Sequence, residues 1–333
     1  MTCNPSVIRT LCVCTAALVL VSAPASSIAA DWKPDKAIEL VVGTGPGSGV
    51  DNTARVVQSI LQMQKIVDPQ ITVNNKPGGP YAVAYNYMSQ FQGDGSKLAV
   101  QTSTPLAALV TGQLTLKYFE FTPIANLITE PILFMVRTES PIANGKDLAQ
   151  RLKADPSALS IALATARGNA FHITAALFAR AAGADAKKLK IVVYTSSGDA
   201  VAALLGGHVD IVAVTPGNFL PLYETKKIRI LGLGSQRRLG GLLATVPTFK
   251  EQGFDVVFDL PRSVMGAKGL SADQIRYWDN AFGRMVKTAE WRQAVEKNQW
   301  EDDYMNSADF AKSLKSQYEI LKDVLTEIGM AKP

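Results

Sequence analysis

Short apolar runs alternate with segments of helical character along most of the chain, and this alternation restricts the possible folds more than any other feature. In the first part of the chain the pattern predicts strands at 38–42, 71–73 and 97–101, and helices at about 51–62 and 81–90. Glycine-rich or turn-rich segments separate these elements. An order of strand, helix, strand, helix, strand is typical of a parallel sheet flanked by helices.

The same alternation begins again near residue 132. It predicts strands at 132–136, 159–163, 190–194, 209–214 and 228–232, and helices at 144–153, 169–182 and 199–205. Asn144 is a suitable N-cap for the first of these helices. Ser271 and Gln274 have the spacing of a capping box, and further helices are expected at about 289–298 and 307–328. We therefore expect an α/β protein of two lobes, each a mostly parallel sheet flanked by helices, with the C-terminal helices covering one face.

The N-terminal 30 residues have the pattern of a secretory signal peptide. Arg9 is their only charged residue, the apolar stretch 11–21 follows it, and small residues fill 22–30. A stretch of eleven residues is too short for a stable membrane span, and a buried N-terminal helix, the alternative, would be expected to be amphipathic. We expect cleavage near Ala30 and a periplasmic product. All three cysteines lie in this segment, so the exported chain has no thiol and no disulfide.

Composition excludes several classes of function. A hydrophobic content of 47% is ample for packed cores. The formal net charge of +5 falls to +4 without the signal peptide, and no Lys/Arg cluster is present, so nucleic-acid binding is not expected. Two histidines make a histidine-based metal centre improbable. No later run of 18 apolar residues predicts a membrane span.

Four predicted strands end in loops rich in glycine or hydroxyl groups and run into helix N-termini, where free N–H groups and the helix dipole favour anions. For any single loop a tight turn is a sufficient explanation. Four such loops, two in each lobe, favour a ligand cleft at the carboxyl ends of the strands. The candidate ligand-binding residues are Thr44, Gly45, Gly47, Ser48, Gly49, Asp51, Thr102, Ser103, Thr104, Thr165, Arg167, Asn169, Phe171, His172, Ser197, Asp199 and Thr215.

For three of these candidates, the sequence allows either a ligand-binding role or a structural role. The guanidinium of Arg167, in a glycine-flanked loop, suits bidentate capture of a carboxylate, or is simply exposed. His172 faces the cleft, or it caps or packs at the start of a helix. Asp51 binds a polar group, or it stabilises the first turn of its helix.

Nucleotide and catalytic motifs are not matched. The G-x-G-x-x-G pattern fails because its sixth position is Ser48 or Val50, and no lysine in the loop supports a P-loop. Ser48 lacks the glycines of a nucleophile elbow. We expect no cofactor, no metal and no enzymatic activity. A secreted serine-type hydrolase, using Ser48 or Ser197 with His172, stays open as an alternative.

Motifs spread over almost the whole exported chain resemble the periplasmic solute-binding receptors of tripartite tricarboxylate transporters, the Bug family. The matching stretches are IELVV at 38–42, PGSGVD at 46–51, AR at 54–55, VNNKPGG at 73–79, VRTESPI at 136–142, GNAFH at 168–172, ALLGGHVD at 203–210 and VPTFKEQG at 246–253. Each is weak alone, but together, in family order, they are specific.

The resemblance implies a Venus-flytrap binding protein without enzymatic activity that delivers a small carboxylate to membrane permease subunits. It implies a first lobe of residues 31–133 and 260–333, a second lobe of 134–259, and crossing segments near 132–136 and 262–267. Family members hold ligand carboxylates with N–H groups, hydroxyls and ordered waters from two loops, here 44–51 and 165–172. A monomer is expected. A ligand-dependent sensor or docking protein is a further alternative.

The sequence departs from the family in both loops. Family members commonly have Pro-Phe where Gly43 and Thr44 stand, which implies a roomier pocket floor. They commonly have Ser-Gly-x-Gly-Ser in the second-lobe loop, where this chain introduces Arg167. These departures allow a larger or aromatic carboxylate, with Phe171 or Tyr81 against its ring.

Overall fold

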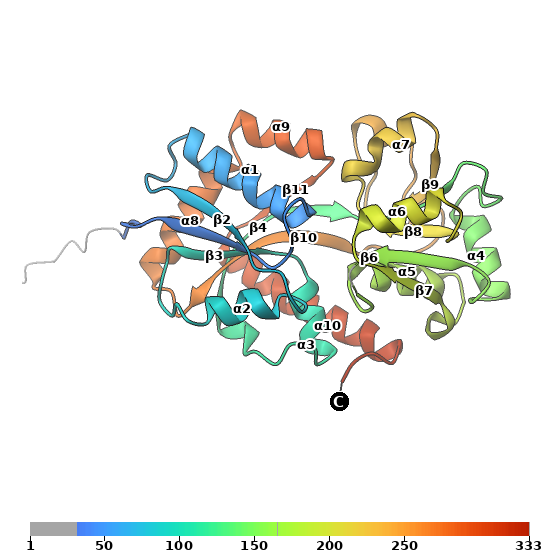
Figure 1. Cartoon of the computed structure of the whole chain (residues 1–333), viewed down its shortest axis with the longest axis horizontal. Coiled ribbons are helices and arrows are strands. Elements are labelled where there is room, and N and C mark those ends of the chain that lie inside the picture. The colour runs from blue at the N-terminus through green and yellow to red at the C-terminus, as the bar shows by residue number, and fades with distance from the viewer. Residues whose placement is uncertain (1–31, 165, 333) are drawn as a thin grey trace, which may run out of the picture. The chain divides into compact units, whose positions relative to one another are not determined.

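Three short strands from the beginning of the chain pair in parallel, as the sequence predicts. They are β1 (Ile38–Val42), β2 (Ile71–Asn75) and β3 (Lys97–Gln101), with β1 between the other two. The computed structural model to which they belong describes residues 32–164 and 166–332 (Figure 1). The expected signal peptide lies outside the described residues.

Strands from distant parts of the chain complete this first sheet. β10 (Asp259–Lys268) pairs antiparallel with β3, β4 (Phe121–Pro131) with β10, and β11 (Glu301–Met305) with β4. The strand order is β11-β4-β10-β3-β1-β2. The sheet is therefore mixed, with a parallel half formed early in the chain and an antiparallel half formed by later strands.

The second sheet is built from the middle of the chain and is also mixed. β6 (Ser160–Ala164) pairs in parallel with β7 (Lys190–Tyr194) and with β8 (Ile211–Val214). β5 (Leu133–Arg137) runs antiparallel to β8 and to β9 (Ile228–Leu233), which gives the order β7-β6-β8-β5-β9. We call the parts built around the two sheets the first and the second lobe.

Helices connect and cover the strands of both sheets. Those of the first lobe are α1 (Gly49–Met63), α2 (Ala82–Met88), α3 (Thr104–Val110), α8 (Ala272–Met285), α9 (Ala289–Asn298) and α10 (Ser307–Glu327). Those of the second lobe are α4 (Gly145–Ala154), α5 (Ala170–Ala181), α6 (Ser197–Leu205) and α7 (Leu220–Glu224). Short 3-10 turns occur at Tyr118–Glu120, Ala186–Lys188, Gly217–Phe219 and Gly241–Leu243.

Two helix starts confirm cap residues predicted from the sequence. The Asn144 side chain accepts from Asp147 N at the start of α4. Ser271 and Gln274 form a reciprocal capping box at the start of α8. Both caps satisfy N–H groups that have no partner inside the helix.

The chain passes between the lobes in two segments that touch each other. β4 leads through Ile132 into β5, and the segment between β9 and β10 returns the chain to the first sheet. Gly234 N donates to Ile132 O at 2.7 Å, and Phe258 N donates to Gly234 O at 3.0 Å. Backbone hydrogen bonds therefore tie both crossings together at one place.

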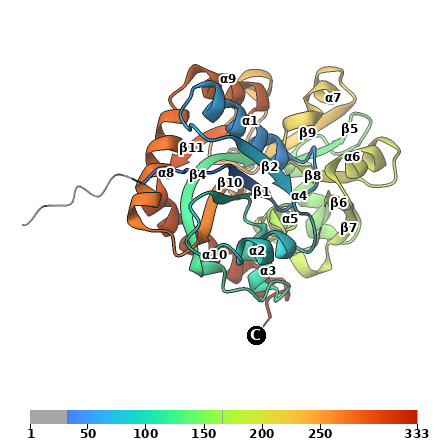
Figure 2. The same cartoon turned by 60° about the vertical axis from the view of Figure 1, so that its left-hand side comes forward.

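The last helix belongs to the first lobe but also contacts the second. α10 packs against α3 and β4, and it lies beside α3 in both views (Figures 1 and 2). Its C-terminal part reaches α5, where Arg180 Nη1 and Glu327 Oε2 form an ion pair of 2.7 Å. Among the described residues no helix combines the length and apolar character needed to cross a bilayer.

Candidate functional site

The loop after β1 is fixed by the buried carboxylate of Asp51. One oxygen accepts from Gly47 N at 2.8 Å and from Arg55 Nε at 2.9 Å, and the other accepts from Asn75 Nδ2 at 2.9 Å. Burial opposes ionisation of Asp51, but these hydrogen bonds outweigh it and lower its pKa. Asp51 thus braces the loop rather than offering a free carboxylate.

The start of α1 lies in the same loop. Ser48 caps the helix by accepting from Asp51 N, and its hydroxyl lies 2.6 Å from that of Thr44. Gly49, the first residue of the helix, is exposed, whereas Gly45 is half-buried. The first N–H groups of an α-helix lack intrahelical partners and favour anions. This turn therefore presents the anion-binding character that the sequence predicts.

The loop after β3 lies at the same edge of the sheet, because β1 and β3 are parallel neighbours with Val42 opposite Val100. Thr102 and Ser103 are buried there. The Thr102 hydroxyl donates to that of Thr104 at 2.8 Å and accepts from Thr104 N at 3.0 Å. The structure thus brings the two first-lobe loops together at one edge.

Tyr81, just before α2, fills the space between these loops. A Cβ added to Gly43 would overlap its ring, 2.7 Å from Cε1. Tyr81 has a positive φ of 68° and is only 3% exposed. Burial raises its pKa to about 12, against the opposing effects of Arg262 and Thr102. Within the described chain its buried hydroxyl lies beside Thr102 but forms no well-aligned hydrogen bond.

Arg262, on β10, is a residue that the sequence reasoning missed as a site candidate. Its Nη2 forms an ion pair with Glu130, whose other carboxylate oxygen accepts from Trp300 Nε1 at 2.9 Å. The side chains of Arg262 and Glu130 are 4% and 6% exposed. Nε and Nη1 of Arg262 are buried without a partner among residues 32–164 and 166–332. A single arginine within the apolar run 260–267 is the only signal that pointed to it.

The loop after β6 is organised by Asn169 and His172. Asn169 caps α5, accepting from His172 N at 3.2 Å and donating to Ala164 O at 2.7 Å. His172 is buried, and its Nδ1 accepts from Gly168 N at 2.9 Å. Burial, with the charge of Arg167, lowers its pKa to about 4, so the imidazole is neutral at pH 7. His172 is therefore a neutral, buried side chain that packs at the start of α5.

The remaining second-lobe candidates are more exposed. Arg167 is exposed, and its Nη2 donates to Ile191 O of β7 at 2.9 Å. Asp199 is exposed and accepts from the Ser196 hydroxyl at 2.8 Å; Ser196, rather than Ser197, caps α6. Phe171, Ser197 and Thr215 are half-buried, and Thr165 lies outside the described residues.

The candidates of the second lobe also share one sheet edge. β6, β7 and β8 are parallel, with Ala164 opposite Tyr194, so the loops that follow them lie at the same edge. Gly168, which lies between the candidates Arg167 and Asn169, approaches the first lobe: a Cβ there would lie 3.1 Å from Met330 and 3.4 Å from Thr111. The candidates therefore form one group in each lobe, and this contact with the first lobe lies beside the second group.

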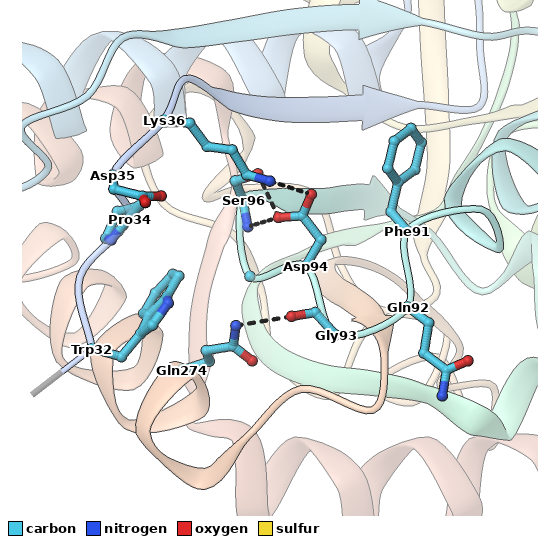
Figure 3. A pocket seen from close by; sticks show the side chains of 11 residues that line it. Trp32, Pro34, Asp35, Lys36, Phe91, Gln92, Gly93, Asp94, Ser96 and Gln274 are labelled. Carbon is cyan, nitrogen blue, oxygen red and sulfur yellow. Dashed lines mark hydrogen bonds and ion pairs between the residues drawn. The ribbon is translucent and has the colours of Figure 1, made fainter. Parts of the chain in front are cut away.

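A surface depression of about 450 Å³ lies elsewhere, at the amino ends of β1 and β3 (Figure 3). Lys36 and Asp94 form an ion pair of 2.9 Å across it, and Gln274 donates to Gly93 O. It is far along the strands from the carboxyl-end loops and contains none of the candidate residues. Among the described residues no group of three or more potential metal ligands occurs.

Comparisons with known proteins agree with this arrangement. The sequence pattern described as tripartite tricarboxylate transporter family receptor matches residues 53–330. A Cupriavidus necator protein named "UPF0065 protein in gbd 5'region" is 29% identical over 322 residues, covering 96% of this chain and 95% of that protein.

Two solved structures have the same fold. "R. palustris Rpa4515 with adipate" gives a TM-score of 0.79 at 20% identity, covering 90% of this chain and 99% of that one. "MatC (Rpa3494) from Rhodopseudomonas palustris with bound malate" gives 0.73 at 21% identity, covering 88% and 99%. These likenesses support the two-lobe α/β fold.

Proposed function

The chain belongs to the tripartite tricarboxylate transporter receptor family, and on that premise we propose that it is an exported receptor that captures a small organic carboxylate and delivers it to membrane permease subunits. The observation that carries the proposal is the pair of loop groups at the carboxyl edges of the two sheets. Each group contains the start of a helix of eight residues or more, α1 in the first lobe and α5 and α6 in the second. A ligand anion between them would accept from N–H groups of both lobes.

The proposed class of ligand rests on the ligands named for two structures with the same fold. Two structures with the same fold carry adipate and malate in their names, so aliphatic dicarboxylates are the first candidates. We propose that the solute binds between the lobes and that closure about the two crossing segments buries it. The proposed lobes comprise residues 31–133 with 260–333, and residues 134–259.

The same proposal covers location and assembly. Residues 1–30 act as a cleaved signal peptide, and the mature protein is a periplasmic monomer. Apart from Asp51, whose carboxylate braces its own loop, the candidate residues remain the proposed contacts, and we add Arg262 and Tyr81 to them on the geometry above.

The hydrolase alternative gains no support from the site. The Ser48 hydroxyl caps α1 and contacts Thr44, and His172 accepts from Gly168 N. Among the described residues no hydrogen bond joins His172 to Ser48 or Ser197, as a nucleophile and its base would require. A binding role without catalysis is therefore the function we propose.

Calorimetry on the chain lacking residues 1–30 tests the proposal. Malate, adipate and benzoate are titrated separately, with neutral adipamide as the matched control. We expect at least one carboxylate to bind with micromolar or tighter affinity and adipamide to bind at least tenfold more weakly. At 100 times its Kd, a bound carboxylate should add about 2.7 kcal/mol of stability, seen as a raised Tm. Binding of none of the three carboxylates, or equal binding of adipamide, would contradict a carboxylate receptor.

A further inference from the structure

We propose that Arg262 and Tyr81, beside the first turn of α1, bind one carboxylate of the solute directly, and we call this the first-lobe carboxylate site. The inference deepens the proposed function and rests on it. It assigns the charged end of the solute to the first lobe and to a guanidinium group.

The Arg262 side chain is held in place by an ion pair, but two of its three nitrogen atoms have no acceptor among the described residues. Glu130 pairs with Nη2, and Trp300 donates to the other oxygen of Glu130, so the carboxylate that anchors Arg262 is itself anchored. Nε and Nη1 point to no acceptor within the described chain although both are buried. A buried donor without a partner is unfavourable, and a planar guanidinium matches the two oxygens of a carboxylate. The side chain is thus prepared for an anion that the protein itself does not supply.

The position of Arg262 matches the predicted ligand edge. Ser263 of β10 lies opposite Gln101, the last residue of β3, so Arg262 lies at the level of the loop that begins with Thr102. A Cβ on Gly49 would lie 2.8 Å from Arg262 Nη2. The guanidinium therefore adjoins the first residue of α1, where unpaired helix N–H groups favour the same anion.

Tyr81 supplies a third donor at the same place. Its buried hydroxyl forms no well-aligned hydrogen bond among the described residues, and Arg262 and Thr102 are close enough to affect its ionisation. A carboxylate has acceptor capacity for all three groups. Because these atoms are covered in this structure, a solute has to displace a neighbour to reach them. Tyr81 has a strained positive φ of 68°, and its hydroxyl forms no well-aligned hydrogen bond, so its side chain is the neighbour that we assign to this movement.

The second lobe offers no equivalent cation among its described loop residues. Arg167 is exposed and donates to the backbone of β7, and His172 is neutral at pH 7. The second lobe is left with helix N-termini, which suit a neutral polar group as well as an anion. We therefore infer that one ionised carboxylate is required and that the opposite end of the solute need not be charged.

Calorimetry on three variants of the chain lacking residues 1–30 tests the site, with adipate, malate and benzoate as probes. Tyr81→Phe removes only the unpaired hydroxyl, so we expect an unchanged or raised Tm without carboxylate and an affinity at least fivefold weaker. Arg262→Lys keeps a charge for Glu130 but loses the planar donor pair, and we expect at least tenfold weaker binding. Arg262→Gln should weaken binding at least as much. Arg292→Lys, at an exposed position of α9, and Tyr223→Phe, in α7, are the matched controls and should bind within twofold of the parent.

The outcomes separate this inference from the proposed function. If the parent chain binds none of the carboxylates, both fail. If the parent binds but Tyr81→Phe and Arg262→Lys bind equally well, the receptor stands and the first-lobe carboxylate site is overturned. Should the Arg262 variants fail to fold after losing a buried ion pair, Tyr81→Phe decides alone. Its weaker binding with an undiminished Tm supports the site, and parent-like binding refutes it.

Discussion

The ring of Tyr81 packs directly on the backbone of Gly43, in the space that any side chain at position 43 would need. A Cβ on Gly43 would lie 2.7 Å from ring Cε1 and nearer still to Cγ and Cδ1. The family resemblance implied a roomier pocket floor where glycine replaces a larger residue. The structure instead fills that space with an aromatic ring from the start of another helix. At this edge of the sheet, the Tyr81 ring therefore occupies the space that the missing side chain at position 43 leaves.

Gly43→Ala should therefore destabilise the protein through the Tyr81 ring. We expect a loss of about 1 to 3 kcal/mol, because the ring has to move from a closely packed place. Urea denaturation of the single and double variants measures the coupling: Gly43→Ala should cost little when Tyr81 is already alanine. Gly45→Ala is the matched control, since a Cβ there meets nothing within 4 Å. Additive losses in the double variant would contradict the packing relationship.

Asp51 should be needed for the shape of the glycine loop rather than for charge recognition. Asp51→Asn keeps the size but weakens the hydrogen bonds from Gly47 and Arg55, and we expect a loss of about 1 to 3 kcal/mol at pH 7. Because the folded pKa of Asp51 is lowered, its contribution is present above the unfolded value of about 3.9 and is lost as pH falls through the folded value.

Urea denaturation at pH 7 and pH 3 measures both effects. The difference between Asp51→Asn and the parent should shrink at pH 3. Asp309→Asn, at an exposed helix start, should change stability by less than about 0.5 kcal/mol. A parent-like stability of Asp51→Asn at pH 7 would show that the brace is dispensable.

Much of the fold was predictable because local patterns determined it. β1, β3 and β7 coincide with the expected residues, since each is a short apolar run bounded by turn residues. β10 and β11 were not expected as strands. β10 contains Pro261 and Gly266, and β11 has the largely polar sequence EDDYM. Such segments become strands only because distant partners offer edges to pair with, and this makes the first sheet mixed.

The candidate site likewise has residues that local sequence patterns predict and residues that depend on tertiary pairing. Ser48 and Asn169 cap helices, a role that local sequence signals readily indicate. Arg262 depends on β10 returning to β3 across more than 150 residues, and no local pattern reports that. Glu130 pairs with Arg262 from β4, and Trp300 in turn donates to Glu130 from a further segment. A side chain whose partners all arrive by tertiary pairing is recognised only when the sheet order is known.

Asp259, at the first position of β10, should make the protein more stable in mild acid. Burial, followed by the charges of Glu301 and Asp303, raises its pKa to about 7, and Oδ1 has no partner among the described residues. The folded state therefore binds more protons than the unfolded chain between about pH 4 and pH 7, so this group lowers stability as pH rises through that window. Arg237 pairs with Glu301, one of these two acidic residues, at 3.4 Å.

Asp259→Asn removes this titration without changing the shape of the side chain. We expect the variant to exceed the parent by about 1 to 3 kcal/mol at pH 8 and to approach it at pH 5, measured by urea denaturation. Asp309→Asn again serves as the exposed control. A difference between Asp259→Asn and the parent that stays constant from pH 5 to pH 8 would contradict a raised pKa at this site.

His172 should act in the opposite direction over an overlapping range. Its folded pKa of about 4 lies below the unfolded value of about 6.5, because burial and the charge of Arg167 disfavour the imidazolium. The unfolded chain therefore binds a proton that the folded state does not, and stability is lost as pH falls from about 6.5 toward 4. Protonation would also remove the acceptor for Gly168 N, so the second-lobe loop should loosen in the same range.

Two measurements distinguish the titration of His172 from that of carboxyl groups, which titrate in a similar pH range. By NMR, the Cε1 proton of His172 should keep its neutral-imidazole chemical shift down to about pH 5. The Cε1 proton of His208, which is exposed, is the internal comparison. By urea denaturation, the parent should lose about 1 to 3 kcal/mol relative to His172→Gln between pH 7 and pH 4.5. His208→Gln should follow the parent. If His172 titrates near pH 6.5, its imidazole is more accessible than the packing around Asn169 and Gly168 allows, and the loop must open in solution.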